Sequence, residues 1–272
     1  MTRRRWWTTA VIVLLLGAWA FPMYWMLVSS VTPDERLFGA VSLIPTRAID
    51  DHYHALFTER RFWVPVLNSV IVAGTTTLLA ILLGVPAAYA IARLRFRGRG
   101  AMAAAILSIS VFPQIAVLSP LFLLLRAVGL IDTYPGLVLP YLTFSMPLAI
   151  WLMAAFFRQL PRDLEEAAVM DGATRVRAAV EIMLPLAAPG IATTAILTFL
   201  YAWNEFLFAL SFTLGPDRHT VPVAIALFRG QYQVPWGQVL AAAVVASVPV
   251  AIVVLAFQRR IVSGLTAGAV KG

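Results

Sequence analysis

Six long apolar stretches, separated by short polar connections, constrain this chain more than any other feature. They lie near residues 9–31, 64–92, 101–125, 137–157, 187–212 and 237–258. Each is long enough to cross a bilayer, which takes about 20 helical residues. Charged residues make up only 12% of the chain, against about 25% in an average soluble domain. The sequence therefore predicts an all-α polytopic membrane protein with six transmembrane helices.

The residue types that are missing exclude several kinds of site. The chain has no cysteine, and Lys271 is its single lysine. A phosphate-binding P-loop requires a lysine within its glycine-rich turn, so any ATP that drives this protein must be bound by another chain. The histidines lie outside the apolar stretches and far apart, and no catalytic set emerges from them. We therefore expect no catalytic residue, no metal site and no bound cofactor on this chain.

The distribution of basic residues predicts the topology. If the N-terminus lies inside, the inner segments hold fourteen of the 21 basic residues and the outer segments hold seven. The positive-inside rule then places both termini in the cytoplasm. The net charge of +8 is explained by this membrane arrangement, so we expect lipid around the chain and no nucleic-acid partner.

Two charged segments are open to more than one interpretation. The run from Arg93 to Arg99 is either a site for a phosphate or lipid head group, or an ordinary charge cluster that anchors the end of a span. The outer segment 32–63 contains His52 and His54, a pair that could bind a metal. No third ligand is evident, so this segment reads as an exposed short helix beside the membrane.

The connection 158–186 has the pattern of two short helices. Asp163 followed three residues later by Glu166 is typical of a capping box at a helix start. Gly172 can adopt the left-handed conformation that ends a helix, and Thr174 can cap a second one. Two functions fit this pattern equally: a docking surface for a cytoplasmic partner, or an interfacial helix pair that binds no partner.

This connection resembles the EAA loop of importer-type ABC permeases. The matching residues are Glu166, Ala167, Ala168, Gly172, Ile182, Leu184 and Pro185, and Asp171 also fits the family. Further segments similar to sugar-importer permeases are Asn68-Ser69, Ala88-Tyr89-Ala90 and 202–206. Residues 257–272 resemble the C-terminus of the maltose-type second permease subunit, and trehalose importers of actinobacteria carry a very similar tail. The resemblance covers the chain except for the outer segment 213–236.

The resemblance implies the fold of a type I ABC importer permease and a division of labour among several chains. A second permease would pair with this chain as a heterodimer, two ATPase subunits would bind ATP and Mg, and an extracytoplasmic sugar-binding protein would deliver the sugar. Coupling to the ATPase would involve Glu166, Ala167, Ala168, Asp171 and Gly172. Contact between the tail and the ATPase would involve Gly264, Leu265, Thr266, Gly268 and Lys271. The chain would be a transport subunit rather than an enzyme, in the cytoplasmic membrane of a bacterium or archaeon.

Glu205 is the clear ionisable residue inside an apolar stretch, and such residues are functional candidates by default. Together with Asn204 it offers carboxylate and amide groups for sugar hydroxyls. The alternative role is a hydrogen bond between helices that fixes packing against the partner permease. Asn68 and Tyr141 are weaker candidates for lining a translocation pathway.

The sequence suggests three parts and leaves the substrate open. Residues 1–62 form an N-terminal transmembrane helix with an extracytoplasmic segment, residues 63–258 form the importer transmembrane domain, and residues 259–272 form a cytoplasmic tail. A glycerol-phosphate or polyol importer is an alternative, but the apolar stretches contain no arginine, which favours a neutral sugar such as trehalose or maltose. A secondary transporter would require inverted repeats and paired broken helices, and the sequence indicates neither.

Overall fold

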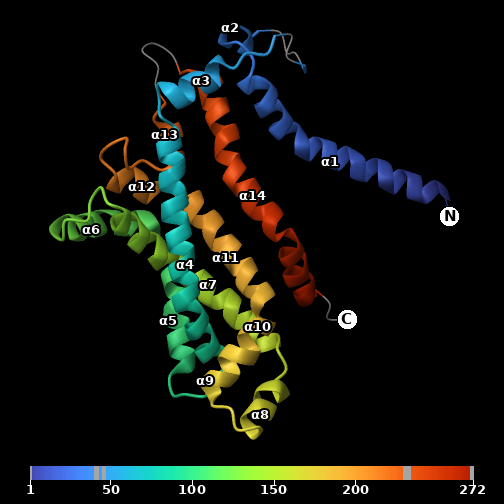
Figure 1. Ribbon diagram of the computed structural model, residues 1–272, viewed down its shortest axis with the longest axis vertical. Helices are drawn as coiled ribbons and strands as arrows, with labels where there is room; N and C mark the ends of the chain where they lie inside the picture. The colour runs from blue at the N-terminus through green and yellow to red at the C-terminus, as the bar shows by residue number, and fades with distance from the viewer. Residues whose placement is uncertain (1, 40–42, 45–46, 229–233, 270–272) are drawn as a thin grey trace. The chain divides into compact units, whose positions relative to one another are not determined.

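The computed structural model describes residues 2–39, 43–44, 47–228 and 234–269, and every secondary-structure element in these ranges is helical (Figure 1). Side chains are described from Trp6 to Gln258 within the same ranges. The elements are α1 (Thr2–Ser30), α2 (Asp34–Leu37), α3 (Asp51–Thr58), α4 (Trp63–Arg93), α5 (Arg99–Val111), α6 (Gln114–Ala127), α7 (Tyr134–Gln159), α8 (Asp163–Met170), α9 (Arg175–Ala178), the π-helix η1 (Ala179–Met183), α10 (Leu184–Leu186), α11 (Ala188–Trp203), α12 (Leu207–Phe212), α13 (Val221–Ala226) and α14 (Trp236–Ala269).

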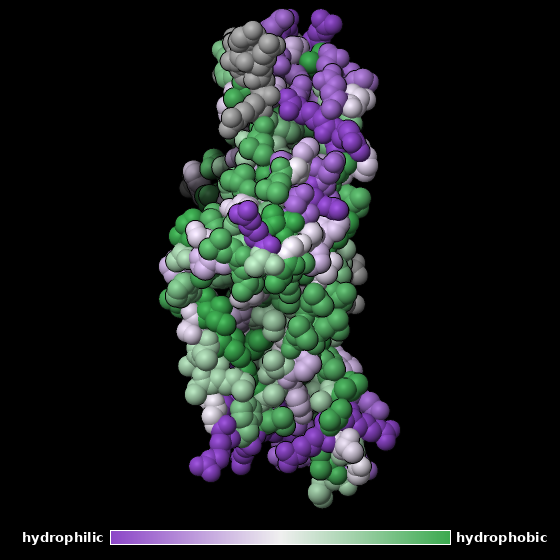
Figure 2. Space-filling view, turned by 90° about the vertical axis from the view of Figure 1, so that its left-hand side faces the viewer, coloured by the Kyte–Doolittle hydropathy of each residue, from purple (hydrophilic) through white to green (hydrophobic). Residues whose placement is uncertain are grey.

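The predicted all-helical membrane fold is confirmed, but the spans are not all straight. Four helices are long and apolar enough to cross a membrane by themselves, namely Trp6–Ser30, α4, α7 and Trp236–Gln258. Two bent pairs bring the number of spans to six if each pair is one span. Figure 2 shows hydrophobic residues over the middle of one face and hydrophilic residues below them. This pattern is the one expected of helices that end at a membrane surface.

The third expected span, 101–125, is broken between α5 and α6, which meet at 94°. The break falls at Phe112 and Pro113. Phe112 has φ −74° and ψ 130°, an extended conformation, as expected for a residue that precedes proline. A second bend, of 72°, precedes α11. Neither bend was predicted, because the sequence indicated no paired broken helices.

The fifth expected span, 187–212, is also not one helix. It ends as α11 at Trp203 and resumes as α12 at Leu207. The three residues between include Glu205, whose carboxylate accepts the backbone N–H groups of Phe208 at 2.8 Å and Ala209 at 3.1 Å. The start of a helix has N–H groups without helical partners, and this side chain supplies acceptors for two of them.

The structure divides into two compact units, which are described separately. The first contains residues 1–63 and 224–249, and the second contains residues 64–223 and 250–272. These units are defined by contacts within the chain and do not test the three parts expected from the sequence, which stay a prediction.

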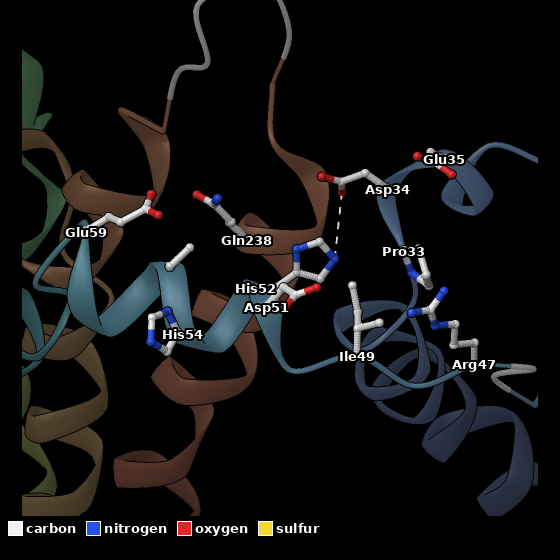
Figure 3. Close-up of a pocket in the computed structure, with 11 residues that line it drawn as sticks. Pro33, Asp34, Glu35, Arg47, Ile49, Asp51, His52, His54, Glu59 and Gln238 are labelled. Carbon is white, nitrogen blue, oxygen red and sulfur yellow. Dashed lines mark ion pairs between the residues drawn. The ribbon is translucent and has the colours of Figure 1, made fainter.

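The first unit is held together around His52, which is buried. Its Nε2 lies 3.0 Å from the Thr32 carbonyl oxygen and 3.9 Å from Asp34 Oδ1. The same Asp34 oxygen accepts the Gly237 N–H at 3.1 Å. A Cβ on Gly237 would lie 2.3 Å from the His52 ring, so only glycine fits there. His52 therefore has a packing role, and its ring does not converge with that of His54 (Figure 3).

These groups line part of a polar pocket of about 560 Å³ in the first unit (Figure 3). Its lining includes carboxylates and two histidines beside Arg47 and Gln238. Gln238 accepts a hydrogen bond of 2.5 Å from Arg60 Nε, and the Arg60 guanidinium lies 4.5 Å from the centre of the Phe228 ring. The predicted short helix of segment 32–63 is thus α3, although His52 and Leu56 on it are buried rather than exposed.

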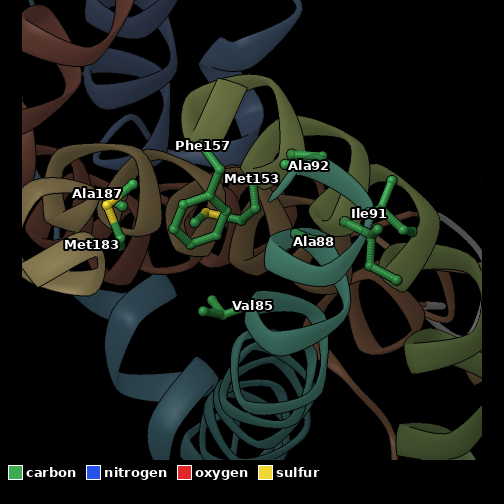
Figure 4. Packing of buried hydrophobic residues seen from close by; sticks show 10 residues of the cluster. Val85, Ala88, Ile91, Ala92, Met153, Phe157, Met183 and Ala187 are labelled. Atoms are coloured by element: carbon green, nitrogen blue, oxygen red, sulfur yellow. The ribbon is translucent and has the colours of Figure 1, made fainter. Parts of the chain in front are cut away.

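The core of the second unit forms where α4, α7 and η1 meet (Figure 4). Its fully buried side chains include Met153 and Phe157 of α7, and Met183 of η1. Ala88 and Ala92 of α4 present only methyl groups, which lets the helices approach closely, as is common in membrane bundles. This core connects the membrane helices to the segment that follows α8.

A second close approach joins α7 to α11. A Cβ on Gly190 would lie 2.4 Å from the ring of Phe156. Overpacking of this kind forces side chains or backbone to move. Gly190 therefore fixes the distance at which the start of α11 packs against α7.

Candidate functional site

The helix α8 carries most of the residues expected to couple to an ATPase. It begins at Asp163, with Arg162 at the capping position and no side-chain capping bond. The expected capping box at Asp163 is therefore wrong, because Asp163 already belongs to the helix. Asp163, Glu165 and Glu166 instead occupy the first turn, where negative charge is favoured by the helix dipole.

The end of α8 follows the prediction. Gly172 has φ +89°, the left-handed conformation that glycine adopts most readily. The Ala173 N–H donates to the Ala168 carbonyl at 3.0 Å, and the Gly172 N–H donates to the Val169 carbonyl at 3.1 Å. This pair of bonds is a Schellman motif. Beyond it, the Thr174 hydroxyl accepts the Arg177 N–H at 3.2 Å, so the expected cap of the second helix is confirmed.

Two polar contacts fasten the junction between α7 and α8 to α4. The Tyr89 hydroxyl, on α4, donates to Glu165 Oε1 at 2.6 Å. One turn further along α4, Arg93 Nη2 donates to the Leu160 carbonyl at 2.5 Å. The Tyr89 ring packs edge-on against Phe157, with centroids 5.6 Å apart. In the sequence, Tyr89 stood out only as part of a segment similar to sugar-importer permeases. No residue near it in the sequence indicates Glu165 as its partner.

The expected coupling residues are mostly exposed. Ala168 is buried beneath the helix, whereas Glu166, Ala167, Asp171 and Gly172 are exposed. Large apolar side chains are exposed beside them: 88% of Met170 and 73% of Val176 are accessible. Val180 of η1 is also exposed. The segment α8–α9 therefore presents an apolar surface bordered by acidic and basic groups.

The pathway candidate Asn68 is buried, and its side chain is fully occupied by hydrogen bonds. Its amide donates to the carbonyls of Asp217 and His219, both at 2.9 Å. Its carbonyl accepts the Tyr134 hydroxyl at 2.7 Å. Asn68 thus anchors the segment between α12 and α13 onto α4 and α7. Tyr134 and His219 were not singled out from the sequence, because they lie 66 and 151 residues away from Asn68.

The same segment is fastened at further points. Asp132 Oδ1 accepts the Leu214 N–H at 2.9 Å, and the Arg218 guanidinium lies 4.5 Å from the centre of the Tyr134 ring. Burial lowers the pKa of His219, and the nearby Asp132 charge opposes this effect. The segment 213–220 is therefore held by many specific contacts.

The other pathway candidates differ in exposure. Glu205 and Tyr141 are buried, whereas Asn204 is exposed and donates to the Leu200 carbonyl at 2.8 Å. Among the described residues, the buried Tyr141 hydroxyl has no hydrogen-bond partner. The oxygens of Glu205 bond to the start of the helix that follows it, α12, which is a local role that neither alternative anticipated. Lining of a pathway by these residues stays a prediction.

The tail residues lie at the end of the chain's longest helix. Gly264, Leu265, Thr266 and Gly268 belong to α14, which runs to Ala269, although their side chains lie outside the described residues. Lys271 lies outside the described residues altogether. The contact of the tail with an ATPase stays a prediction.

Comparisons with known proteins agree with this geometry. The model of the family described as "Binding-protein-dependent transport system inner membrane component" matches residues 80–266. The trehalose transport system permease protein SugB of Mycobacterium tuberculosis is 46% identical over 272 residues, which is 99% of each chain. The trehalose/maltose transport system permease protein MalG of Thermococcus litoralis is 41% identical over 270 residues, or 96% of this chain and 97% of the relative.

A solved structure shares the fold. It is the crystal structure of a bacterial ABC transporter involved in the import of the acidic polysaccharide alginate, and one of its chains matches with a TM-score of 0.80. The match covers 96% of this chain and 98% of that one, at 23% sequence identity. The chain therefore belongs to the family of inner membrane components of binding-protein-dependent transport systems, the permeases of ABC importers.

Proposed function

We propose that this permease imports a neutral sugar of disaccharide size, as one half of a heterodimer driven by two ATPase subunits that bind ATP and Mg. An extracytoplasmic binding protein would deliver the sugar. The relatives that are named for trehalose and maltose support the sugar class. The absence of arginine from the six apolar stretches supports a neutral substrate, because a phosphorylated one requires cationic groups along its path.

The observation that carries the coupling role is the exposed apolar surface of α8–α9. Met170 of α8 and Val176 of α9 are both exposed, although they lie in a connection outside the apolar stretches. An exposed apolar patch with a polar rim is typical of a protein interaction site. The neighbouring Glu166 and Asp171 supply charge at its border, which favours a specific orientation of the partner. Docking of an ATPase on this surface would push on α8, and the contacts of Glu165 and Leu160 would pass the displacement to α4.

Replacement of Met170 tests this assignment. Because this side chain is 88% exposed, Met170→Asp should leave folding intact while placing a charge in the docked interface. We expect the variant to insert normally but to co-purify with less ATPase and to lose sugar-stimulated ATP hydrolysis. Leu214→Asp is the matched control, because Leu214 is 72% exposed and lies in the outer segment. Equal ATPase recovery from the wild type and Met170→Asp would contradict the coupling role.

The substrate is tested separately by uptake. The permease would be reconstituted with its partner permease, ATPase and binding protein, and radiolabelled trehalose, maltose and glycerol 3-phosphate would be compared. We expect saturable ATP-dependent uptake of a disaccharide. Uptake of glycerol 3-phosphate alone would contradict the neutral-sugar assignment.

Cytoplasmic placement of both termini completes the proposal and has a convenient test. The chain contains no cysteine, so single cysteines can be introduced without prior removal of others. Cysteines at Asp171 and Thr266 should react with membrane-impermeant maleimide only after the membrane is opened, whereas one at Leu214 should react in intact cells. The reverse pattern would overturn the topology.

A further inference from the structure

A narrow apolar groove runs between α4, α5 and α7 in the second unit. Its volume is about 140 Å³, and its lining is Ile91, Ala103, Ile106, Leu107, Pro147, Ile150, Trp151, Ala154 and Arg158. All of these residues except Arg158 are apolar. Arg158 lies in the last turn of α7 and is exposed. The groove is thus hydrocarbon-like along its length and cationic at one end.

The length of the groove matches one leaflet of a bilayer. From Pro147 to Arg158 the axis of α7 rises about 16 Å at 1.5 Å per residue. The hydrocarbon core of a bilayer is about 30 Å thick, so each leaflet contributes roughly half of that. Arg158 lies in the last turn of α7, at the end of the helix that leads into the α8–α9 segment. One acyl chain would therefore fill the groove with its head group beside Arg158.

A cluster of arginines adjoins the same end. Arg95, Phe96, Arg97 and Arg99 line a surface hollow of about 390 Å³. Arg99 is one helical turn before Ala103, so it shares the face of α5 that lines the groove. In the part of the chain that the structure describes, the ion pairs are His52–Asp34 and Arg177–Glu181. Neither involves these arginines or Arg158. The sequence contains no acidic residue between Glu59 and Asp132, so no acidic group of this stretch neutralises Arg95, Arg97 or Arg99.

We propose that the groove and its arginines bind one anionic phospholipid, with an acyl chain along α7 and the phosphate between Arg158, Arg99 and Arg97. Guanidinium groups match the geometry of phosphate oxygens and bind them in a bidentate manner. The groove accepts the acyl chain of any phospholipid equally well, because all lipid tails are similarly apolar. Selectivity for this lipid therefore comes from the charges, and basic pockets between membrane helices are suited to that.

The proposal goes beyond the transport function and resolves the two interpretations of the arginine run in favour of a head-group site. A charge cluster that only anchors a span would not require a groove beside it. Conversely, a groove without cations would accept any lipid. The two features occur together at one end of the same helices.

The test compares lipids retained by the purified transporter. Delipidated complex would be mixed with equal amounts of phosphatidylglycerol and phosphatidylcholine, and bound lipid measured by native mass spectrometry. We expect phosphatidylglycerol to be retained in preference. Arg99→Gln with Arg158→Gln should reduce its retention on the order of 25-fold, since each basic group near the surface contributes roughly fivefold. Ala103→Leu, which fills the groove and keeps every charge, should also reduce retention.

Two controls separate this site from its alternatives. Arg126→Gln removes the same charge from the last turn of α6, outside the groove, and should leave retention unchanged, whereas an equal loss would show general electrostatic attraction and overturn the site. Glycerol 3-phosphate added in excess should compete weakly, because it lacks the acyl chain. Full competition would indicate a free-phosphate site instead. Equal retention of both lipids, or no retained lipid in the assembled complex, would also overturn the proposal.

Discussion

Replacing Gly172 with alanine tests whether the turn after α8 positions the docking surface. Gly172 has φ +89°, and the two hydrogen bonds that close α8 depend on this conformation. A Cβ at this position would meet no atom within 4 Å, so the substitution adds backbone strain and no steric clash. An alanine in the left-handed region costs about 1–2 kcal/mol. Asparagine tolerates that region better, so Gly172→Asn should have the smaller effect.

This strain sets an upper limit on the loss of docking. If the free loop relaxes to another conformation, docking must restore the turn. The apparent Kd for the ATPase then rises in inverse proportion to the fraction of the loop that stays competent. A cost of about 1–2 kcal/mol corresponds to a factor of about 5–30. We therefore expect Gly172→Ala to weaken ATPase binding by up to this factor, with a parallel loss of sugar-stimulated ATP hydrolysis.

The assay is surface plasmon resonance of the ATPase on the immobilised permease pair, followed by hydrolysis measurements in proteoliposomes. Gly129→Ala is the matched control, because Gly129 also has a positive φ of +71° and no atom within 4 Å of an added Cβ. It lies between α6 and α7, away from α8. Unchanged binding and hydrolysis in Gly172→Ala would refute the reasoning. So would an equal loss in Gly129→Ala, since the effect would then be general strain.

Four further changes probe other contacts. Asn68→Leu should lower the stability of the purified chain by about 1–3 kcal/mol for each polar group left unpaired, and a melting temperature equal to that of wild type would contradict this. Gly190→Ala should destabilise by about 1–3 kcal/mol through overpacking against Phe156; adding Phe156→Leu should restore part of the loss, and no recovery would argue against the clash. Tyr89→Phe should lower the sugar transported per ATP hydrolysed while leaving ATPase binding intact, and an unchanged ratio would show that the bond to Glu165 is dispensable. Burial lowers the pKa of His219 below its usual 6.5, so the unfolded chain binds more protons and stability should fall as pH drops through that value. His219→Gln should flatten this dependence in melting curves recorded between about pH 8 and 5, and a flat wild-type curve would contradict it.

Features set by local sequence were largely predictable. The apolar stretches predict the membrane helices, because length and hydrophobicity are properties of consecutive residues. Gly172 and Thr174 were assigned correctly because their roles follow from their own backbone and side-chain chemistry. The capping box at Asp163 failed because such a pattern still fits when the helix starts one residue earlier, and helix boundaries are the least certain feature of a sequence.

The sequence indicates where one of the helices can break, but not the angle of the bend. Pro113 marked a position where a helix could break, but the angle of 94° between α5 and α6 depends on packing that no local pattern encodes. The break after Trp203 carries no proline or glycine. It is recognisable only once Glu205 is seen to bond to the start of α12.

Contacts between distant residues were not predictable from one sequence. The partners of Asn68 lie 149 and 151 residues away, and Tyr89 and Glu165 are 76 residues apart. Nothing in the segment around each residue indicates its partner. Their roles arise from the fold, which brings the end of α4 beside α8 and the segment 213–220 beside Asn68.

The two contacts at the end of α4 also decide how the joint between α7 and α8 can move. Tyr89 and Arg93 are four residues apart and therefore project from the same side of α4. One holds the Glu165 side chain beyond the joint, and the other holds the Leu160 carbonyl before it. A joint fastened on both sides has lost the freedom of a hinge. A torque applied to α8 therefore rotates α4 and α7 together, unless it first breaks one of these two hydrogen bonds.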